Sequence, residues 1–364
     1  MRWSPQQESA LSAVRSWLQA ADRPVFRLFG YAGTGKTTLA RHIAEGVGGN
    51  VVYAAFTGKA AHVMRGKGCA DAGTIHSLIY RMRGEDETGP SFVLNRESAA
   101  AKAAIIIIDE CSMVDEEIGK DLLTFGKPVL VLGDPAQLPP VAGGGFFTAA
   151  EPDVMLTEVH RQAADDPIIR LSMTVREGGT LALGDYGESS VISRRDLEPD
   201  AVLAADTVLV GRNNTRRAYN GRIRELRGRT APTPVVDDTL VCLKNDRKRG
   251  LLNGSIWHVD KVRPPRKGLL RYTLSADEGI RGKGRTVVTV NPAYFDGTAE
   301  ALTPSERKRS DAFDFGYVLT VHKSQGSQWD DVVLFDESFA FRENAWRWLY
   351  TGITRAARRI RIVR

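Results

Sequence analysis

The sequence predicts an α/β protein with two parallel sheets in tandem. Short runs of β-branched and aliphatic residues recur along the 364 residues, with helical segments between them. Runs that are apolar without interruption are typical of central strands covered by helices on both faces. The length exceeds the usual size of one domain, roughly 100 to 200 residues, so two cores are expected. The clearest runs occupy residues 51–55, 104–108, 129–132, 208–210, 332–334 and 360–363.

Composition restricts the class of protein. Hydrophobic residues make up 42% and charged residues 26% of the chain, enough to bury a substantial core. The net charge of +6 suits a polyanionic partner, although a solvated basic surface is the simpler explanation. Cys69, Cys111 and Cys242 form no CxxC pair, so we expect neither a zinc site nor disulfides, and a reducing cytoplasm fits. No apolar run approaches the roughly 18 residues of a membrane span, so no membrane association is expected.

Two segments interrupt the alternation of strands and helices. Residues 83–94 combine turn residues with a short apolar run, which predicts a surface hairpin. Residues 239–312 alternate strand-like pieces with glycine, proline and charge clusters such as 247–249. This second segment is predicted to be a small β-rich insert.

Residues 30–37 satisfy the pattern G-x-x-x-x-G-K-[ST] of a phosphate-binding loop. The pattern follows the apolar run 25–29 and precedes the helical run 38–44, which makes it more specific than a glycine-rich turn. In such a loop backbone amides converge on phosphate oxygens, Lys36 reaches the β- and γ-phosphates, and Thr37 offers its hydroxyl to Mg²⁺. The predicted nucleotide contacts here are Gly33, Thr34, Gly35, Lys36, Thr37 and Thr38.

Two adjacent carboxylates, Asp109 and Glu110, directly follow the apolar run 105–108. The carboxyl ends of strands in an open parallel sheet face the ligand crevice. We therefore expect Asp109 to hold Mg²⁺, and Glu110 to orient or deprotonate an attacking water. A solvated strand end is the alternative for such a pair taken alone.

A third apolar run, residues 129–132, leads into the proline-containing segment 133–140. The amide of Gln137 in this segment is predicted to hydrogen-bond the attacking water and to respond to the γ-phosphate. A surface turn without ligand is the alternative.

The segments together resemble, in order, the motif series of superfamily 1 helicases, most closely the RecD/Dda-like group of the 1B branch. Phe56 stands where relatives usually have proline, and Cys111 and Gly352 replace commoner alanines, but no reacting group is lost. The matching segments are residues 4–10 (Q motif), 57–61 (Ia), 74–76 (Ib), 109–114 (II), 133–140 (III), 156–162 (IV), 319–327 (V) and 349–356 (VI).

The resemblance implies two RecA-like P-loop NTPase domains with two inserts. Domain 1A is expected at residues 1–78 and 100–165, with a hairpin insert, 1B, at 79–99. Domain 2A is expected at 166–238 and 313–364. A β-rich, SH3-like insert, 2B, is expected at 239–312.

The resemblance also implies the site residues. Gln7 is expected to read the adenine, and Arg161 and Arg355 to stabilise charge on the transferred phosphoryl group, completing a catalytic set with Lys36, Glu110 and Gln137. Either arginine alone would be read as a surface ion pair. The expected DNA contacts are Phe56, Thr57, Lys59, Thr74, His76, Asn214, Thr320 and His322.

Several of these DNA contacts also have structural explanations. Phe56 could equally be a buried aromatic at a strand end, and Asn214 the N-cap of a helix. Taken alone, His76 and His322 would be read as packed histidines.

The activity implied is that of an ATP-dependent DNA helicase moving 5′ to 3′ on a single strand, with ATP and Mg²⁺ as cofactors. The implied partners are single-stranded and forked duplex DNA and proteins of replication, repair or recombination, and a monomer is expected. A translocase or protein-displacing remodeller that leaves strands paired is the main alternative. A P-loop phosphotransferase and a nucleotide-gated binding module leave more of the motifs unexplained.

Overall fold

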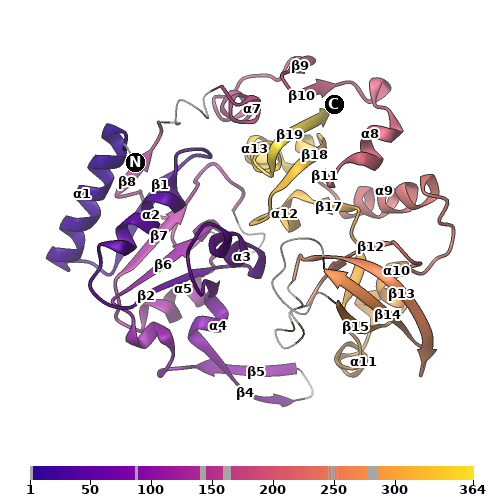
Figure 1. The fold of residues 1–364 in the computed structure, drawn as a ribbon, viewed down its shortest axis with the longest axis horizontal. Coiled ribbons are helices and arrows are strands. Elements are labelled where there is room, and N and C mark those ends of the chain that lie inside the picture. Colours follow the sequence, from indigo (N-terminus) through magenta and orange to yellow (C-terminus); the bar gives the residue numbers. More distant parts are fainter. Residues whose placement is uncertain are drawn as a thin grey trace.

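The computed structural model describes residues 3–86, 89–139, 145–158, 165–244, 246, 249, 251, 253–276 and 285–364. Of residues 82, 84–86 and 89–91 it describes the backbone alone. Figure 1 shows a first lobe in indigo to magenta, a second lobe in pink and yellow, and an orange insert beside the second lobe. Two parallel sheets and antiparallel inserts confirm the predicted α/β class.

The first lobe is built on a parallel sheet in the order β3-β2-β6-β7-β1-β8. Its strands are β1 (Val25–Gly30), β2 (Val51–Ala55), β3 (Gly73–Thr74), β6 (Ile105–Asp109), β7 (Val129–Gly133) and β8 (Val154–Leu156). Its helices are α1 (Pro5–Ala20), α2 (Lys36–Glu45), α3 (Gly58–Gly66), α4 (Ile75–Ile79) and α5 (Glu116–Leu123), with the 3-10 turns η1 (Ala99–Lys102) and η2 (Cys111–Met113).

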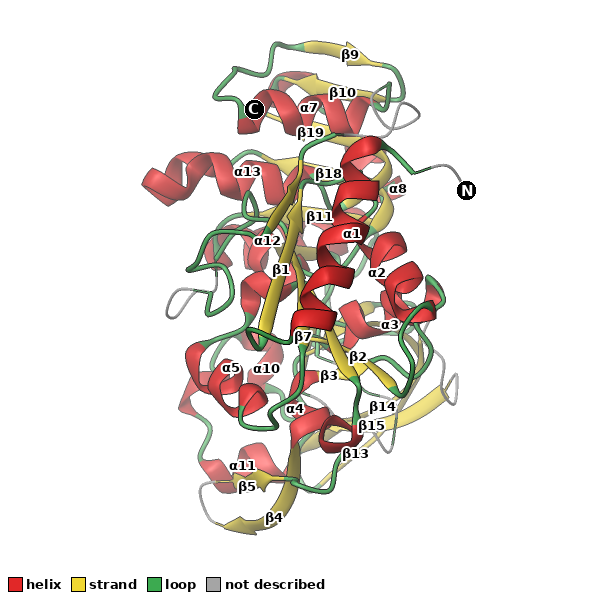
Figure 2. Ribbon diagram, turned by 90° about the vertical axis from the view of Figure 1, so that its left-hand side faces the viewer, coloured by secondary structure: helices red, strands yellow, loops and turns green. Residues whose placement is uncertain are grey.

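Strand β6 shows why its sequence is apolar throughout. Ile105 and Ile107 pack in a cluster with residues of α1 and α2, whereas Ile106 and Ile108 pack with residues of α4 and α5. Successive side chains of a strand point to opposite faces, so a strand covered on both sides has no polar position. In Figure 2, α1, α2 and α3 lie on one side of these strands and α4 and α5 on the other.

The second lobe repeats this arrangement with the strand order β17-β11-β18-β19-β10-β9, in which only the edge strand β9 is antiparallel. Its strands are β9 (Gly184–Tyr186), β10 (Ser189–Ile192), β11 (Thr207–Val210), β17 (Val318–Thr320), β18 (Trp329–Phe335) and β19 (Ala356–Val363). Its helices are α7 (Pro167–Arg176), α8 (Pro199–Ala204), α9 (Asn213–Leu226), α12 (Val321–Ser324) and α13 (Ala345–Ile353), with η3 (Arg194–Asp196) and η5 (Ser338–Asn344).

Two antiparallel inserts extend from the lobes. Strands β4 (Tyr80–Asp86) and β5 (Gly89–Leu94) pair as the hairpin predicted near residues 83–94. The larger insert has a five-stranded sheet, β15-β14-β13-β12-β16, around buried Trp257 and Tyr272. Its elements are β12 (Thr239–Cys242), β13 (Ile256–Arg266), β14 (Leu269–Ala276), β15 (Arg285–Val290), α10 (Ala293–Asp296), η4 (Ala299–Ala301), α11 (Pro304–Arg309) and β16 (Phe313–Phe315).

The sheet of the larger insert runs past residue 312, where the sequence predicted its end. Strand β16 pairs with β12 through Leu240 and Phe315, and Phe313 and Phe315 both lie in the core of the insert. The alternating pattern Phe-Asp-Phe gives one apolar face, which the insert buries. A three-residue strand such as β16 carries little sequence signal of its own.

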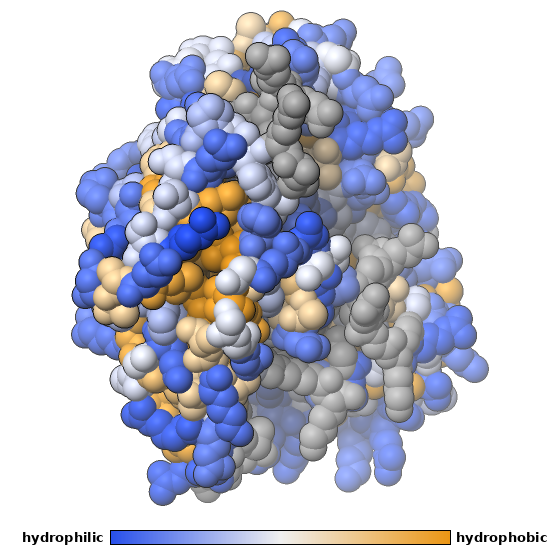
Figure 3. All heavy atoms as spheres, turned by 60° about the vertical axis from the view of Figure 1, so that its left-hand side comes forward, coloured by the Kyte–Doolittle hydropathy of each residue, from blue (hydrophilic) through white to orange (hydrophobic). Residues whose placement is uncertain are grey.

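The face drawn in Figure 3 is mostly hydrophilic, with hydrophobic residues gathered near its middle behind polar side chains. In the described part of the chain, no helix combines the length and the apolar character needed to cross a bilayer.

A buried carboxylate joins the second lobe to the larger insert. Asp238 has no exposed surface and precedes β12, where the chain leaves the lobe. It accepts hydrogen bonds from Arg224 of α9, from Arg229 at 3.1 Å and from the hydroxyl of Tyr317 at 2.8 Å. Tyr317 immediately precedes β17, where the chain returns. One carboxylate therefore ties both connecting strands to α9.

Asp238→Ala is expected to lower the free energy of unfolding by about 3 to 5 kcal/mol, because it leaves two arginines without their buried counter-ion. Urea denaturation followed by circular dichroism measures the loss. Glu188→Ala is the matched control, because it removes a carboxylate from the exposed pair with Arg358 and should leave the midpoint unchanged. Equal midpoints for the two variants would contradict the importance of this joint.

Candidate functional site

Three adjacent strands of the first lobe end at one place. β7 pairs with both β1 and β6, all in parallel, so their carboxyl ends lie side by side. The loop 30–37 follows β1, Asp109 ends β6, and Gly133 ends β7. The sheet order thus brings together the three segments that the sequence singled out.

The loop between β1 and α2 has the geometry of a phosphate cradle. Gly33 and Gly35 have φ values of 79° and 81°, in the left-handed region that glycine adopts without strain. Helix α2 begins at Lys36, so its free amides and its positive end point into the loop. The Nζ atom of Lys36 donates to the carbonyl oxygens of Gly30 at 2.6 Å and Tyr31 at 2.9 Å. The ammonium group is thereby held over the loop.

Thr37 and Asp109 form an oxygen pair beside this loop. The hydroxyl of Thr37 donates to Oδ2 of Asp109 at 3.0 Å. Hydroxyl and carboxylate oxygens suit Mg²⁺, which usually takes its other ligands from water and substrate phosphates. Among the described residues no group of three or more His, Cys, Asp or Glu could hold a metal. The pair therefore fits Mg²⁺ bound together with a nucleotide.

Glu110 has an unusual backbone conformation for a residue with a side chain, with φ 53° and ψ 46°. Such strain is retained where the surroundings fix it, and it directs this carboxylate into the site. Burial raises the pKa of Glu110, the nearby Arg355 opposes that shift, and Asp109 adds to it. A carboxylate with a raised pKa is a stronger proton acceptor when ionised, as a general base requires.

A cavity of about 350 Å³ lies between the two lobes around these residues. From the first lobe it is lined by Ala32, Gly33, Gly35, Lys36, Thr37, Thr38, Ala60, Val63, Lys67, Asp109, Glu110, Gly133, Asp134 and Gln137. From the second lobe it is lined by Gly326, Ser327, Gln328, Thr354 and Arg355. The predicted residues from the two ends of the chain therefore meet at one cavity.

Arg355 is the charged residue that the second lobe contributes to this lining. Its side chain is buried, and its guanidinium donates to the carbonyls of Thr351 and Ser327 and to the hydroxyl of Thr354. These neutral acceptors orient the group without cancelling its charge. A planar cation is thus held ready opposite Lys36 and Glu110.

Gln137 lies in the turn after β7 and also lines the cavity. Its Oε1 atom is buried and has no hydrogen-bond partner among the described residues. Its backbone amide donates to the carbonyl of Asp134, which fixes the turn. A side-chain amide with a spare acceptor in this position can receive a hydrogen bond from a water molecule.

Two expected nucleotide contacts, Gln7 and Thr34, are not among the residues that line the cavity. Gln7 is buried, and its side chain caps α1 through Ser4 and donates to the carbonyl of Thr34 at 3.1 Å. Through this bond it supports the backbone of the phosphate loop. Thr34 is also buried, with its hydroxyl bonded to Tyr31. Arg161 lies outside the described residues.

Three threonines expected to contact DNA share one structural role. Thr57, Thr74 and Thr320 are the N-caps of α3, α4 and α12, and each hydroxyl accepts from an amide of its own helix. Thr74 and Thr320 are also buried. In this structure the three threonines therefore cap their helices and fix where the helices begin.

The other expected DNA contacts have packing partners or are exposed. Phe56 packs against the first-lobe core, and Lys59 lies 4.0 Å from the ring centre of Trp329 in the second lobe. His76 contacts Tyr80 and Phe92, and His322 contacts Phe341. Asn214 is exposed inside α9, so the explanation of Asn214 as an N-cap is wrong, because Arg212 holds that position.

Sequence reasoning gave no role to Tyr350 or Gln325, although both lie in recognised segments. The side-chain amide of Gln325 donates a hydrogen bond to the carbonyl of Leu138, and the hydroxyl of Tyr350 donates one to the carboxylate of Asp134. Contacts across lobes depend on three-dimensional packing, so only their segments could have pointed to them.

Comparison with known families identifies two regions. Residues 3–196 match the family described as AAA domain, and residues 315–363 match the UvrD-like helicase C-terminal domain. The first match covers more than half of the chain.

Characterised relatives are longer proteins. The chain is 29% identical to the ATP-dependent RecD2 DNA helicase of Deinococcus radiodurans over 93% of its own length and 46% of that protein. It is 34% identical to the ATP-dependent DNA helicase dda of Enterobacteria phage T4 over 41% of this chain and 37% of that protein. The chain thus spans less than half the length of either relative.

Solved structures share the fold. A Bacteroides Pif1 helicase in complex with ADP-AlF3 and ssDNA superposes with a TM-score of 0.57, at 19% identity, over 99% of this chain and 92% of that one. Pif1 helicase from Candida albicans superposes with a TM-score of 0.56 at 19% identity, over 100% and 94% of the two chains.

Burial lowers the pKa of His322, so the unfolded chain binds that proton more tightly than the folded one. Wild type should therefore lose stability as pH falls through the unfolded value of about 6.5, and His322→Gln should lose less. Urea midpoints at two pH values on either side of this value measure the difference. His42→Gln, at an exposed position, controls for the loss of a histidine. If His322→Gln followed the wild-type pH profile, folding would not lower the pKa of this half-buried histidine.

Proposed function

The chain belongs to the AAA-domain family and to the RecD/Dda/Pif1-like helicases of superfamily 1B, and on this basis we propose that it is an ATP-dependent DNA helicase. The observation that carries the proposal is the shared cavity. Lys36 and Glu110 reach it from the first lobe, and Arg355 from the second. A nucleotide bound there would draw the lobes together, and its hydrolysis would release them.

The residues divide the work of phosphoryl transfer. Lys36 and Arg355 supply positive charge from opposite walls as negative charge develops on the phosphoryl oxygens. Glu110 accepts a proton from the attacking water, and Gln137 orients that water through its free acceptor. Mg²⁺, held by Thr37 and Asp109, would neutralise phosphate charge. We assign Arg161 a matching charge role and Gln7 adenine recognition from the resemblance alone.

A single DNA strand is the proposed track. The α3, α4 and α12 regions would contact its phosphates through Thr57, Lys59, Thr74, His76, Thr320 and His322, with Phe56 and Asn214 alongside. Contacts of this kind hold the backbone without reading sequence. The close approach of Gly326 to Thr57 supports coupling between the DNA contacts and the nucleotide cavity. A Cβ atom at position 326 would lie 2.8 Å from Oγ1 of Thr57, across the lobe boundary. The DNA-facing helix of one lobe thus directly contacts the other lobe beside the cavity.

Several finer features of the proposal rest on family membership. They are 5′ to 3′ movement, domain 1A at 1–78 and 100–165 with 1B at 79–99, and domain 2A at 166–238 and 313–364 with 2B at 239–312. The hairpin β4–β5 is the proposed strand-separating element, and forked duplex DNA the proposed substrate. A monomeric state, a cytoplasmic location, and partners from replication, repair or recombination also belong to the proposal.

Wild-type ATPase activity should rise when single-stranded DNA is added, and Arg355→Gln should lower kcat by about 10³-fold, by analogy with arginine fingers. Lys36→Ala should abolish turnover. A coupled assay of ADP release with and without DNA measures both. Arg358→Ala, an exposed arginine three positions along, is the matched control and should behave as wild type.

Two results would change the proposal. Turnover that is indifferent to DNA would favour a P-loop phosphotransferase and end the motor assignment. DNA-stimulated turnover without separation of a labelled fork would leave a translocase or remodeller that moves on nucleic acid with its strands paired.

A further inference from the structure

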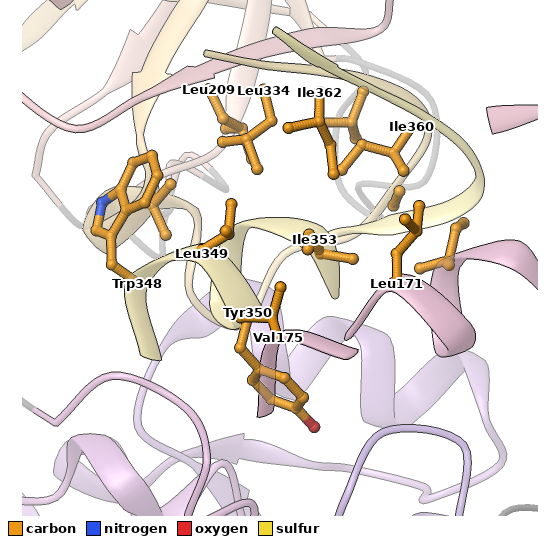
Figure 4. Packing of buried hydrophobic residues seen from close by; sticks show 14 of the residues in the cluster. Leu171, Val175, Leu209, Leu334, Trp348, Leu349, Tyr350, Ile353, Ile360 and Ile362 are labelled. Carbon is orange, nitrogen blue, oxygen red and sulfur yellow. The ribbon is translucent and has the colours of Figure 1, made fainter. Parts of the chain in front are cut away.

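Tyr350 of α13 belongs to the second lobe, but its side chain ends in the first. The residue is 1% exposed, and its ring packs in a cluster formed mainly by second-lobe residues, including Leu349 and Ile353. Figure 4 shows its hydroxyl oxygen pointing away from the other labelled side chains, toward the purple ribbon of the first lobe. The ring therefore anchors a polar group that crosses the lobe boundary.

The hydroxyl joins two segments of the nucleotide site. It accepts a hydrogen bond from the amide of Ala32 in the phosphate loop at 3.1 Å. It donates its proton to Oδ2 of Asp134, after β7, at 2.6 Å. A hydroxyl has one proton and can accept as well, so a single oxygen bridges both segments.

Asp134 in turn organises the turn that carries Gln137. Its Oδ1 atom accepts from the amide of Ala136 at 3.0 Å, and its carbonyl accepts from the amide of Gln137 at 3.1 Å. The carboxylate is 3% exposed, so it depends on these partners. A displacement of the Tyr350 hydroxyl would therefore displace Gln137 as well.

The same helix carries two more contacts with the site. Thr351 accepts from the amide of Leu138 at 2.9 Å, on the far side of the Gln137 turn. Arg355 follows the helix end by two residues and lines the cavity. Helix α13 thus positions the phosphate loop, the Gln137 turn and the arginine together. Tyr350 and Thr351 both bond to the segment around Gln137, and the Tyr350 hydroxyl also joins this segment to the phosphate loop.

We propose that Tyr350 is a positioning residue for ATP hydrolysis, whose hydroxyl locks the phosphate loop and the Gln137 turn into one arrangement when the lobes close. The inference rests on the proposed ATPase function. The bridge crosses the lobe boundary, so it forms only while the lobes are together. It would therefore make the arrangement of the catalytic groups depend on closure.

Tyr350→Phe keeps the ring and removes the bridge. We expect kcat for DNA-stimulated ATP hydrolysis to fall about tenfold, the effect of losing one well-placed hydrogen bond. KM for ATP and the affinity for a non-hydrolysable analogue should stay near wild type, because Lys36 and the glycine amides remain. Without nucleotide, hydrogen exchange of the peptide containing Ala32 should become faster, because its amide loses its acceptor.

Tyr317→Phe is the matched control. It removes a tyrosine hydroxyl that donates to the buried carboxylate of Asp238 at 2.8 Å, but at the joint with the larger insert. It should keep wild-type kcat and wild-type exchange at Ala32. Equal kcat values for the two variants, or a rise in KM with unchanged kcat in Tyr350→Phe, would overturn the inference. If DNA did not change the wild-type rate of ATP hydrolysis, the proposed motor function would be refuted. Hydrogen exchange at Ala32 would still show whether the Tyr350 hydroxyl bonds to that amide.

Discussion

The seating of α13 against the first lobe is the contact on which the site depends. A nucleotide cavity with Lys36 on one wall and Arg355 on the other exists only while the two lobes are together. Tyr350 accepts a hydrogen bond from Ala32 and donates one to Asp134 across this boundary. Leu138 donates its amide to Thr351 and accepts a hydrogen bond from the side chain of Gln325, also across the boundary. Apolar contacts accompany these hydrogen bonds, because Ala136 and Leu138 of the first lobe pack in the same buried cluster as the core of the second lobe.

Contacts near the proposed DNA side reinforce the same boundary. Gly326 leaves no room for a side chain beside Thr57, and the ammonium group of Lys59 lies over the ring of Trp329. The amide of Trp329 donates to the carbonyl of Arg355. A change at the start of α3 is therefore connected, through one aromatic residue, to the backbone of the arginine in the cavity. In the proposed motor, this connection would link the DNA side to the nucleotide cavity.

The sheets and the nucleotide-binding segments were predictable because each has a local signature. Uninterrupted apolar runs such as Ile105–Ile108 mark strands buried on both faces, and the glycines of residues 30–37 mark a loop that needs left-handed backbone. The placement of Gln7, the bridge of Tyr350 and the extra strand β16 were not predictable. The bond of Gln7 to Thr34, the bridge of Tyr350 and the pairing of β16 with β12 each depend on a partner far away in the sequence.

A structure with a non-hydrolysable ATP analogue, Mg²⁺ and a short oligothymidine tests the central claim most directly. The account predicts that the Arg355 guanidinium and Nζ of Lys36 both lie about 3 Å from oxygens of the terminal phosphate. A nucleotide held by the first lobe alone, with Arg355 still bonded to Thr351, Ser327 and Thr354, would contradict it.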